Sequence, residues 1–340
     1  MKRTIGIFIF LSLTQIILSQ EKNYPKMVFK TDAAKSEFTL FLAKNYCSNA
    51  SSILSFAEKP KKYTHYIDGT SYFSQLISYS TEIHEMCHVA NFDIGGFETH
   101  GFFISDEIKL KILKGPVYKS SELNKMVPLD QQKRIFRYIT YIRGTTDGGI
   151  RIPFLSSVNE GIYGLLNEFT AYYQGTQAAL EIYPYVKSSY AEKNYQFVVD
   201  YLQQQSSEVY AYYEFRLFFA WYLNYAEKKH PNVYKSCIEN QDLKVAITLV
   251  DQLYRKTVEK YKETRQNLVD EINHSGKMKA SIDQKGGIVI GEEFNSTTWG
   301  GPDEMINYLQ SLMTEKYELS LNQLLISGLT LENYKTFSTK

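Results

Sequence analysis

Two histidines and a glutamate have a spacing that suits metal-dependent hydrolysis. His84, Glu85 and His88 form an HExxH pattern within residues 81–89. Residues four apart on a helix share a face, so both imidazoles can bind one tetrahedral Zn²⁺ while Glu85 points toward the open coordination position. Zinc lowers the pKa of its bound water, and a neighbouring carboxylate can move that water's proton to the leaving amine. The pattern therefore predicts zinc-dependent hydrolysis, with His84 and His88 as ligands and Glu85 as general base and acid.

The same residues have an alternative interpretation, in which both histidines and Glu85 are ordinary core or surface residues. The chain contains only six histidines, so a chance match to the pattern is uncommon. The surrounding segment is rich in apolar residues, and burying imidazoles and a carboxylate there without a metal or hydrogen-bond partners is unfavourable. We therefore prefer the metal site.

A catalytic zinc ion normally takes three protein ligands, and the third must come from elsewhere in the chain. The metzincin pattern requires a glycine three residues after the second histidine and a histidine three residues further on. The chain has Asn91 and Ile94 at these positions. The metzincin class is therefore excluded.

The segment of residues 166–173, with its Asn-Glu-x-x-Ala order, resembles the segment that carries the third ligand in the glutamate zincins, or gluzincins. The resemblance covers only this segment and the HExxH segment, of which the latter is the more specific. It implies that Glu168 completes a zinc site with His84 and His88, and that the activity is peptide-bond hydrolysis. Two features depart from the pattern: Glu82 is charged where such peptidases usually have an uncharged residue, and the motifs lie further apart than in the thermolysin-like members.

The surroundings of Glu168 favour the same role independently of the resemblance. Its neighbours Leu165, Leu166 and Phe169 are apolar, and an unpaired carboxylate among them would be costly. Two alternatives stay open. Glu168 can lie at the edge of the apolar stripe facing solvent, or Glu160, two turns earlier, can be the ligand instead.

Hydrolysis also requires a hydrogen-bond donor for the oxyanion that develops on the scissile carbonyl. Tyr172 follows Glu168 by one helical turn on the same face and is our candidate, with Tyr173 and His100 as alternatives. Because the chain has 28 tyrosines, core packing is the competing interpretation for each of them. Asn167 is a candidate for orienting a ligand histidine.

Hydrophobic periodicity predicts a mainly helical α+β protein. The HExxH helix should span about residues 72–90 and end near Asn91, with a short strand following it. Further helices are expected over 135–144, 157–185, most of 188–274 and from Asp303, with a strand at 288–290. We expect residues 21–185 to form the zincin-like catalytic region with a small sheet, and residues 186–340 to form a helical region that completes the cleft.

The N-terminus predicts export from the cytoplasm. Residues 1–20 combine a basic start with a short apolar run and end on small or polar residues, as in a signal peptide. We expect a secreted or periplasmic protein without a stable membrane anchor, although an uncleaved anchor is the alternative. Whether residues 20–70 act as a prosegment stays open. Of the three cysteines, only Cys47 and Cys237 are candidates for a disulfide.

Composition narrows the choice of partners. The formal net charge is +1, with 44% hydrophobic and 22% charged residues, so the chain is globular and lacks the positive field typical of nucleic-acid binding. We expect a secreted zinc metallopeptidase that acts on peptides or proteins. The alternatives are an exported, non-catalytic helical binding or scaffold protein and a zinc amidase acting on cell-wall peptides. The substrate preference and oligomeric state stay open.

Overall fold

The computed structural model describes residues 29, 31–56, 71–145, 149, 156–190, 195–291 and 302–334. The predicted signal peptide, residues 1–20, lies outside this part of the chain. Among the helices described, none is long and apolar enough to cross a membrane.

The fold is α+β and mainly helical, as predicted. The α-helices of the described chain are α2 (Asp32–Tyr46), α3 (Ser48–Ser55), α4 (Tyr72–Gly95), α5 (Leu129–Arg134), α6 (Ser156–Asn159), α7 (Ile162–Tyr190), α8 (Tyr195–Gln204), α9 (Ser206–Lys229), α10 (Pro231–Glu239), α11 (Gln241–His274), α12 (Pro302–Leu312) and α13 (Glu315–Leu324). A 3₁₀-helix, η2 (Ser120–Lys125), and a single π-helical turn, η3 (Ile139–Arg143), lie between β2 and α6. Two antiparallel hairpins complete the fold: β1 (Thr99–Phe103) with β2 (Lys109–Leu113), and β3 (Ala280–Ile282) with β4 (Ile288–Ile290).

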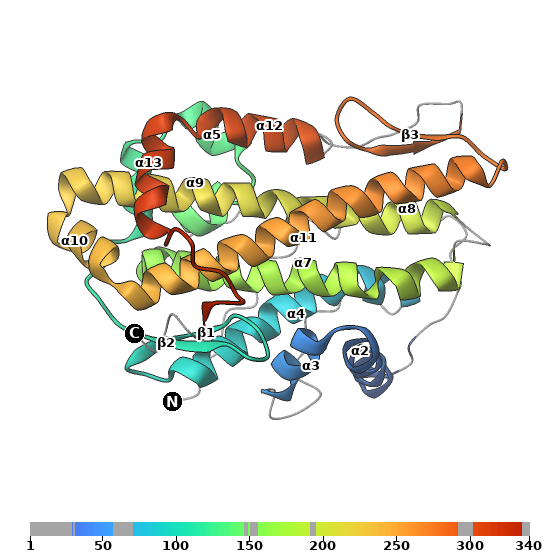
Figure 1. The fold of residues 1–340 in the computed structure, drawn as a ribbon, viewed down its shortest axis with the longest axis horizontal. Coiled ribbons are helices and arrows are strands. Elements are labelled where there is room, and N and C mark those ends of the chain that lie inside the picture. Colours follow the sequence, from blue (N-terminus) through green and yellow to red (C-terminus); the bar gives the residue numbers. More distant parts are fainter. Residues whose placement is uncertain are drawn as a thin grey trace.

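Helix α7 runs through the middle of the molecule (Figure 1). It packs against α4 on one side and against α9 and α11 on the other, which explains why it is buried along most of its length. Gly175 permits close contact with α4, because a Cβ at this position would lie 2.5 Å from the carbonyl oxygen of Ser80 and 3.4 Å from the Cβ of His84. The two helices that carry the predicted ligands are therefore held directly against each other.

Helix α4 begins at a serine cap and ends one turn later than predicted. The Ser71 side chain accepts a hydrogen bond from the Ser74 amide, and Gly96, with a φ of 71°, terminates the helix. Strand β1 crosses the last turn so closely that a Cβ on Gly101 would lie 2.3 Å from the carbonyl oxygen of Asn91. The packing of this strand extends the helix to Gly95.

Two other predicted elements differ from the observed ones, and a third is confirmed. The helix predicted at 157–185 is divided into α6 and α7 at Gly161, whose φ is 56° and whose Cβ would meet the Tyr222 hydroxyl at 2.4 Å. The helix predicted at 135–144 is only the π-helical turn η3, preceded by the short α5. The strand at 288–290 is confirmed as β4, whereas its partner β3 was not predicted.

The buried apolar side chains form one continuous cluster that includes residues from both predicted regions, 21–185 and 186–340. The three cysteines are free and buried, so the one candidate disulfide, between Cys47 and Cys237, is not formed. The Cys47 thiol instead lies 3.6 Å from the Ala178 carbonyl oxygen of α7, whereas Cys237 belongs to α10.

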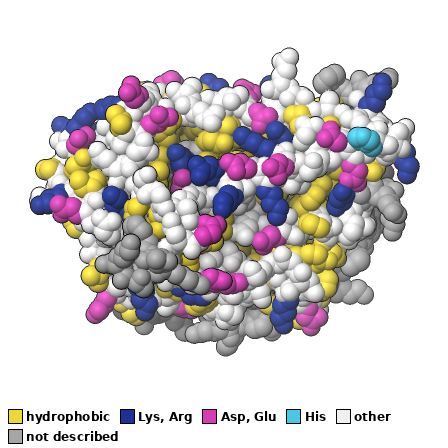
Figure 2. All heavy atoms as spheres, viewed as in Figure 1, with side chains coloured by type: hydrophobic (Ala, Val, Ile, Leu, Met, Phe, Trp, Pro, Cys, Tyr) yellow, Lys and Arg dark blue, Asp and Glu magenta, His cyan; other side chains and the backbone are white. Residues whose placement is uncertain are grey.

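On the face shown in Figure 2, basic and acidic side chains of the described residues are interspersed.

Candidate metal centre

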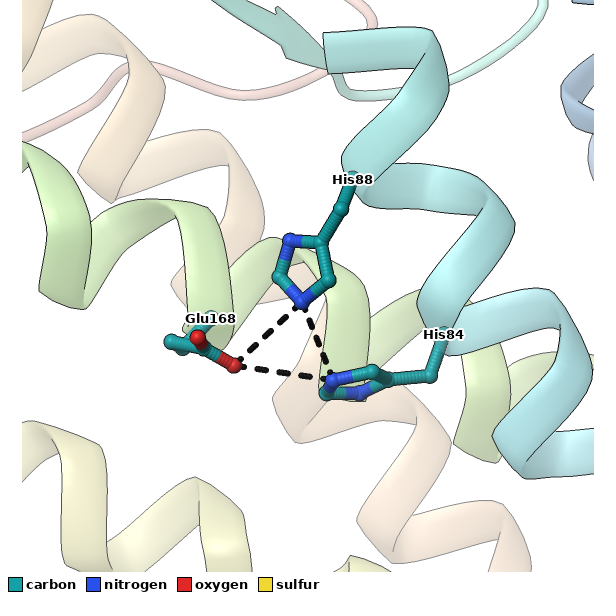
Figure 3. Close-up of side chains that lie close together, drawn as sticks. All are labelled: His84, His88 and Glu168. Carbon is teal, nitrogen blue, oxygen red and sulfur yellow. Dashed lines mark hydrogen bonds and ion pairs between the residues drawn. The ribbon is translucent and has the colours of Figure 1, made fainter. Parts of the chain in front are cut away.

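Three side chains from two helices converge on one point (Figure 3). His84 and His88 extend from α4, and Glu168 extends from α7 to meet them. The Nε2 atoms of the two histidines are 3.1 Å apart, and the Glu168 Oε2 atom lies 3.5 Å from His84 Nε2 and 3.4 Å from His88 Nε2. The predicted grouping of these three residues is confirmed, while zinc ligation itself stays a prediction.

The donor atoms suit a metal ion in both spacing and chemistry. A tetrahedral ion bound at about 2.1 Å requires neighbouring ligand atoms about 3.4 Å apart, which matches the three separations. Glu168 Oε2 is also buried without a hydrogen-bond partner, a state that native proteins rarely tolerate unless something else satisfies the atom. Two imidazole nitrogens and a carboxylate oxygen form a donor set that binds first-row divalent metals well. The site is therefore a buried group that can hold a metal ion.

A hydrogen-bonded chain behind the ligands fixes the orientation of His88. Asn91 Nδ2 donates to Asn167 Oδ1 at 2.6 Å, so this amide oxygen is an acceptor, and it lies 3.2 Å from His88 Nδ1. His88 Nδ1 therefore carries the hydrogen and directs its Nε2 toward the other ligands. Asn91 Oδ1 in turn accepts from the Phe103 amide at 2.7 Å, which links the chain to strand β1. Asn167 thus contacts His88 as the expected orienting role requires, and the role itself stays a prediction.

The electrostatics of the metal-free site favour a proton where the ion would bind. Burial lowers the pKa of His88, but the Glu168 carboxylate outweighs this effect and raises that pKa to about 9. Burial likewise raises the pKa of Glu168, but His88 and His84 together lower it to about 2. Without metal, His88 and Glu168 therefore form an ion pair at neutral pH. A bound cation takes the place of the His88 proton.

Glu85 lies next to His84 on α4 and is only partly buried. Its negative charge is among the influences that raise the pKa of His88. On the helix, Glu85 and His88 face the side of α4 that is less buried than the side packed on α7. This position suits a proton acceptor for a molecule that enters the site.

Tyr172 packs against the ligand His84. Their ring centroids are 4.3 Å apart at an angle of 71°, and the Tyr172 hydroxyl lies 2.8 Å from the hydroxyl of Tyr141. The Arg137 guanidinium carbon also lies close to this tyrosine, 4.2 Å from the centroid of its ring. The structure therefore places the predicted donor beside the site and adds two residues, Tyr141 and Arg137, that the sequence did not indicate.

The competing candidates lie elsewhere. Glu160 pairs with His100, whose Nδ1 lies 3.6 Å from the Glu160 Oε2 atom, and His100 stacks on Tyr163 with centroids 4.5 Å apart. Tyr173 contacts Tyr254 of α11 at 6.0 Å between centroids. Of the two glutamates considered as third ligand, Glu168 is the one that meets the histidines.

Glu82, the charged residue at a position where gluzincins usually have an uncharged one, is completely buried in α4. It accepts a hydrogen bond from the Thr39 hydroxyl at 3.0 Å, and burial raises its pKa well above the usual range. Burial therefore favours the neutral form of this carboxyl over the charged form.

Protein-family models, curated proteins and solved structures were compared with the chain, and none of them matches it.

Proposed function

We propose that this protein is a zinc-dependent peptidase. The observation that carries the proposal is the group formed by His84, His88 and Glu168, whose donor atoms lie 3.1 to 3.5 Å apart with one carboxylate oxygen unsatisfied. Glu85 adds a second carboxylate beside this group, which a purely structural metal site does not need. The signal-like segment at residues 1–20 supports action outside the cytoplasm.

Each residue has a role that follows from its position. A zinc ion held by His84, His88 and Glu168 supplies Lewis-acid chemistry when it is bound. Glu85 accepts a proton from the attacking water and passes it to the leaving amine. Tyr172 donates a hydrogen bond to the substrate carbonyl oxygen as negative charge develops there. Asn167 holds the ring of His88 in the orientation that ligation requires.

The test is hydrolysis by the purified zinc-loaded protein. We expect cleavage of casein or of a mixed peptide library, loss of cleavage with chelator, and recovery when zinc is added back. Glu85→Gln should lower kcat by at least about a hundredfold with zinc still bound, because it removes the proton acceptor. Glu98→Gln, at an exposed glutamate, is the matched control.

Two results would contradict the proposal. A zinc-loaded wild type that cleaves neither casein nor peptides would favour a binding or scaffold protein. Cleavage of purified wall fragments without cleavage of casein or the library would instead favour a cell-wall amidase.

A further inference from the structure

Residues 137–141 contact Tyr172 in two places, at its ring and at its hydroxyl. The Arg137 guanidinium lies against the ring, and the Tyr141 hydroxyl meets the Tyr172 hydroxyl. The Tyr141 amide donates to the Arg137 carbonyl at 2.9 Å, so both contacts come from one turn of backbone that leads into η3. Single π-helical turns of this kind often occur at functional sites.

The two tyrosine hydroxyls have one hydrogen more than their mutual bond uses. Each phenol brings one hydrogen, and the 2.8 Å bond between them consumes only one of the two. Within the described part of the chain, neither hydroxyl has another hydrogen-bond partner within bonding distance, although Tyr141 is 5% and Tyr172 is 7% exposed. A buried donor without an acceptor is unfavourable, so the spare hydrogen points to an acceptor that binds there.

The position of the pair identifies where that acceptor lies. The Tyr172 ring lies against the ring of His84, with centroids 4.3 Å apart, and the Tyr141 hydroxyl lies 2.8 Å from the Tyr172 hydroxyl. Both hydroxyls therefore belong to the surroundings of the candidate metal centre. A group bound at that centre with an oxygen acceptor, such as an acyl carbonyl, would accept the spare hydrogen.

Arg137 is too deeply buried to serve as a surface charge. Its side chain is 3% exposed, and Glu214 of α9 accepts from both its Nη1 at 2.9 Å and its backbone amide at 3.1 Å. Glu208 lies 3.7 Å from Nη2. Buried ion pairs of this kind are weak sources of stability, because desolvation offsets most of their attraction. Their rigid geometry nevertheless fixes what they touch, which here is the ring of Tyr172.

We propose that Tyr141 and Tyr172 form one paired hydroxyl donor for a substrate carbonyl oxygen at the metal centre, with Arg137 as the positioning residue for Tyr172. The proposal rests on the peptidase function proposed above and adds Tyr141 as a further catalytic residue. The pair contributes hydrogen bonding only, so no bond to either tyrosine forms or breaks during hydrolysis.

The kinetic test compares Tyr141→Phe, Tyr172→Phe and the double variant with Tyr201→Phe. Tyr201 is the matched control, because its buried hydroxyl donates to the Ala179 carbonyl at 2.8 Å and has no contact with the tyrosine pair. Each single variant should lower kcat by about tenfold to hundredfold with little change in KM. The kcat of the double variant should be no lower than that of the less active single variant. Wild-type kcat in either variant, or losses that multiply in the double variant, would overturn the proposal.

A second measurement does not depend on turnover. Acetohydroxamate binding to the cobalt-loaded protein, followed by visible absorption, places an oxygen acceptor at the metal. Tyr141→Phe and Tyr172→Phe should each weaken this binding by about tenfold, as expected for loss of a hydrogen bond to a charged group, and Tyr201→Phe should not. Equal affinities in all four proteins would overturn the donor pair, whereas binding without any peptide cleavage would contradict only the peptidase function.

Discussion

Two regions of the core bury charged side chains, and they differ in how those charges are satisfied. Arg216 of α9 pairs with Asp251 of α11, and Arg265 of α11 pairs with Asp303 of α12 at 2.9 Å, so each charge has a partner of opposite sign. Between α4 and α7, two imidazole nitrogens and a carboxylate oxygen face one another, and the oxygen has no hydrogen-bond partner. In the first arrangement each charge has its own partner, whereas in the second three metal-binding atoms share one point, which either the His88 proton or a metal cation can occupy. Burial of charge alone therefore does not indicate a functional site, but convergence of several metal-binding atoms on one point does.

The largest difference between the regions should appear when one group is removed from each. His88→Ala should weaken zinc binding by at least about a thousandfold, because a tetrahedral site with three protein ligands loses one of them. Asp251→Asn should leave zinc affinity unchanged and lower only the thermal midpoint. Competition with a chromophoric chelator measures the first effect and circular dichroism the second. Comparable zinc affinities in His88→Ala and the wild type would remove the distinction.

The pH dependence of metal binding should be the next largest effect. The pKa of His88 is about 9 in the metal-free site, so the proton must leave before the ion binds, and affinity should rise about tenfold per pH unit between pH 7 and 9. Glu168, with a pKa of about 2, stays ionised over this range and adds nothing to the slope. Isothermal titration in buffers of different ionisation enthalpy measures the released proton. A flat profile would contradict the His88–Glu168 ion pair.

The same ion pair predicts the sign of a stability change in the metal-free protein. The pKa of His88 is raised in the folded state, so its contribution is complete below about pH 6.5 and is lost as pH rises through about 9. Chelated wild type should therefore lose stability over this range relative to chelated His88→Gln. Urea unfolding at several pH values checks this, and parallel curves for the two proteins would contradict it.

The amide chain behind His88 should have a smaller effect. Asn167→Ala should weaken zinc binding by about tenfold to hundredfold, because His88 loses the acceptor that sets its orientation. Asn49→Ala is a suitable control, since the Asn49 amide bonds to Gln174 and to the Asp106 backbone instead of a metal ligand. Equal zinc affinities in the two variants would show that the chain through Asn91 has no role in ligation.

The smallest expected effect distinguishes the buried Arg137 from the partly buried Arg216. Arg137→Lys and Arg216→Lys should destabilise the protein similarly, because each replaces a planar guanidinium that pairs with a carboxylate and lies near a tyrosine ring. Only Arg137→Lys should lower kcat, by about tenfold, since only Tyr172 belongs to the metal centre. Steady-state kinetics with matched thermal melts distinguishes the two, and equal kcat values would deny Arg137 a positioning role.

The candidate site was predictable from the sequence only where residue type and helical spacing carry the information. The interval between His84 and His88 defines one helix face, and the apolar neighbours of Glu168 favoured it over Glu160. Tyr141 and Arg137 gave no such signal, because the apolar periodicity of residues 135–144 predicted only an ordinary helix and tyrosines are abundant in the chain.

The same limit applies to the fold. Apolar periodicity predicted α4, α7 and β4, but not the division between α6 and α7 at Gly161. That division depends on contacts with Tyr222 and the Tyr118 carbonyl, which lie far away in the sequence. Similarly, the Asn91 side chain donates to Asn167 of α7 and accepts from the Phe103 amide of β1. Both partners lie in other elements of the fold, so the local sequence does not predict these hydrogen bonds.

The most direct test of the central claim is the metal content of the purified protein, measured by elemental mass spectrometry on wild type, His84→Ala, Glu168→Gln and Glu160→Gln after growth in limiting zinc. The account predicts one zinc per wild-type chain, none in His84→Ala, a reduced amount in Glu168→Gln and the full amount in Glu160→Gln. A wild-type protein without bound metal, or an equal loss in both glutamate variants, would contradict it.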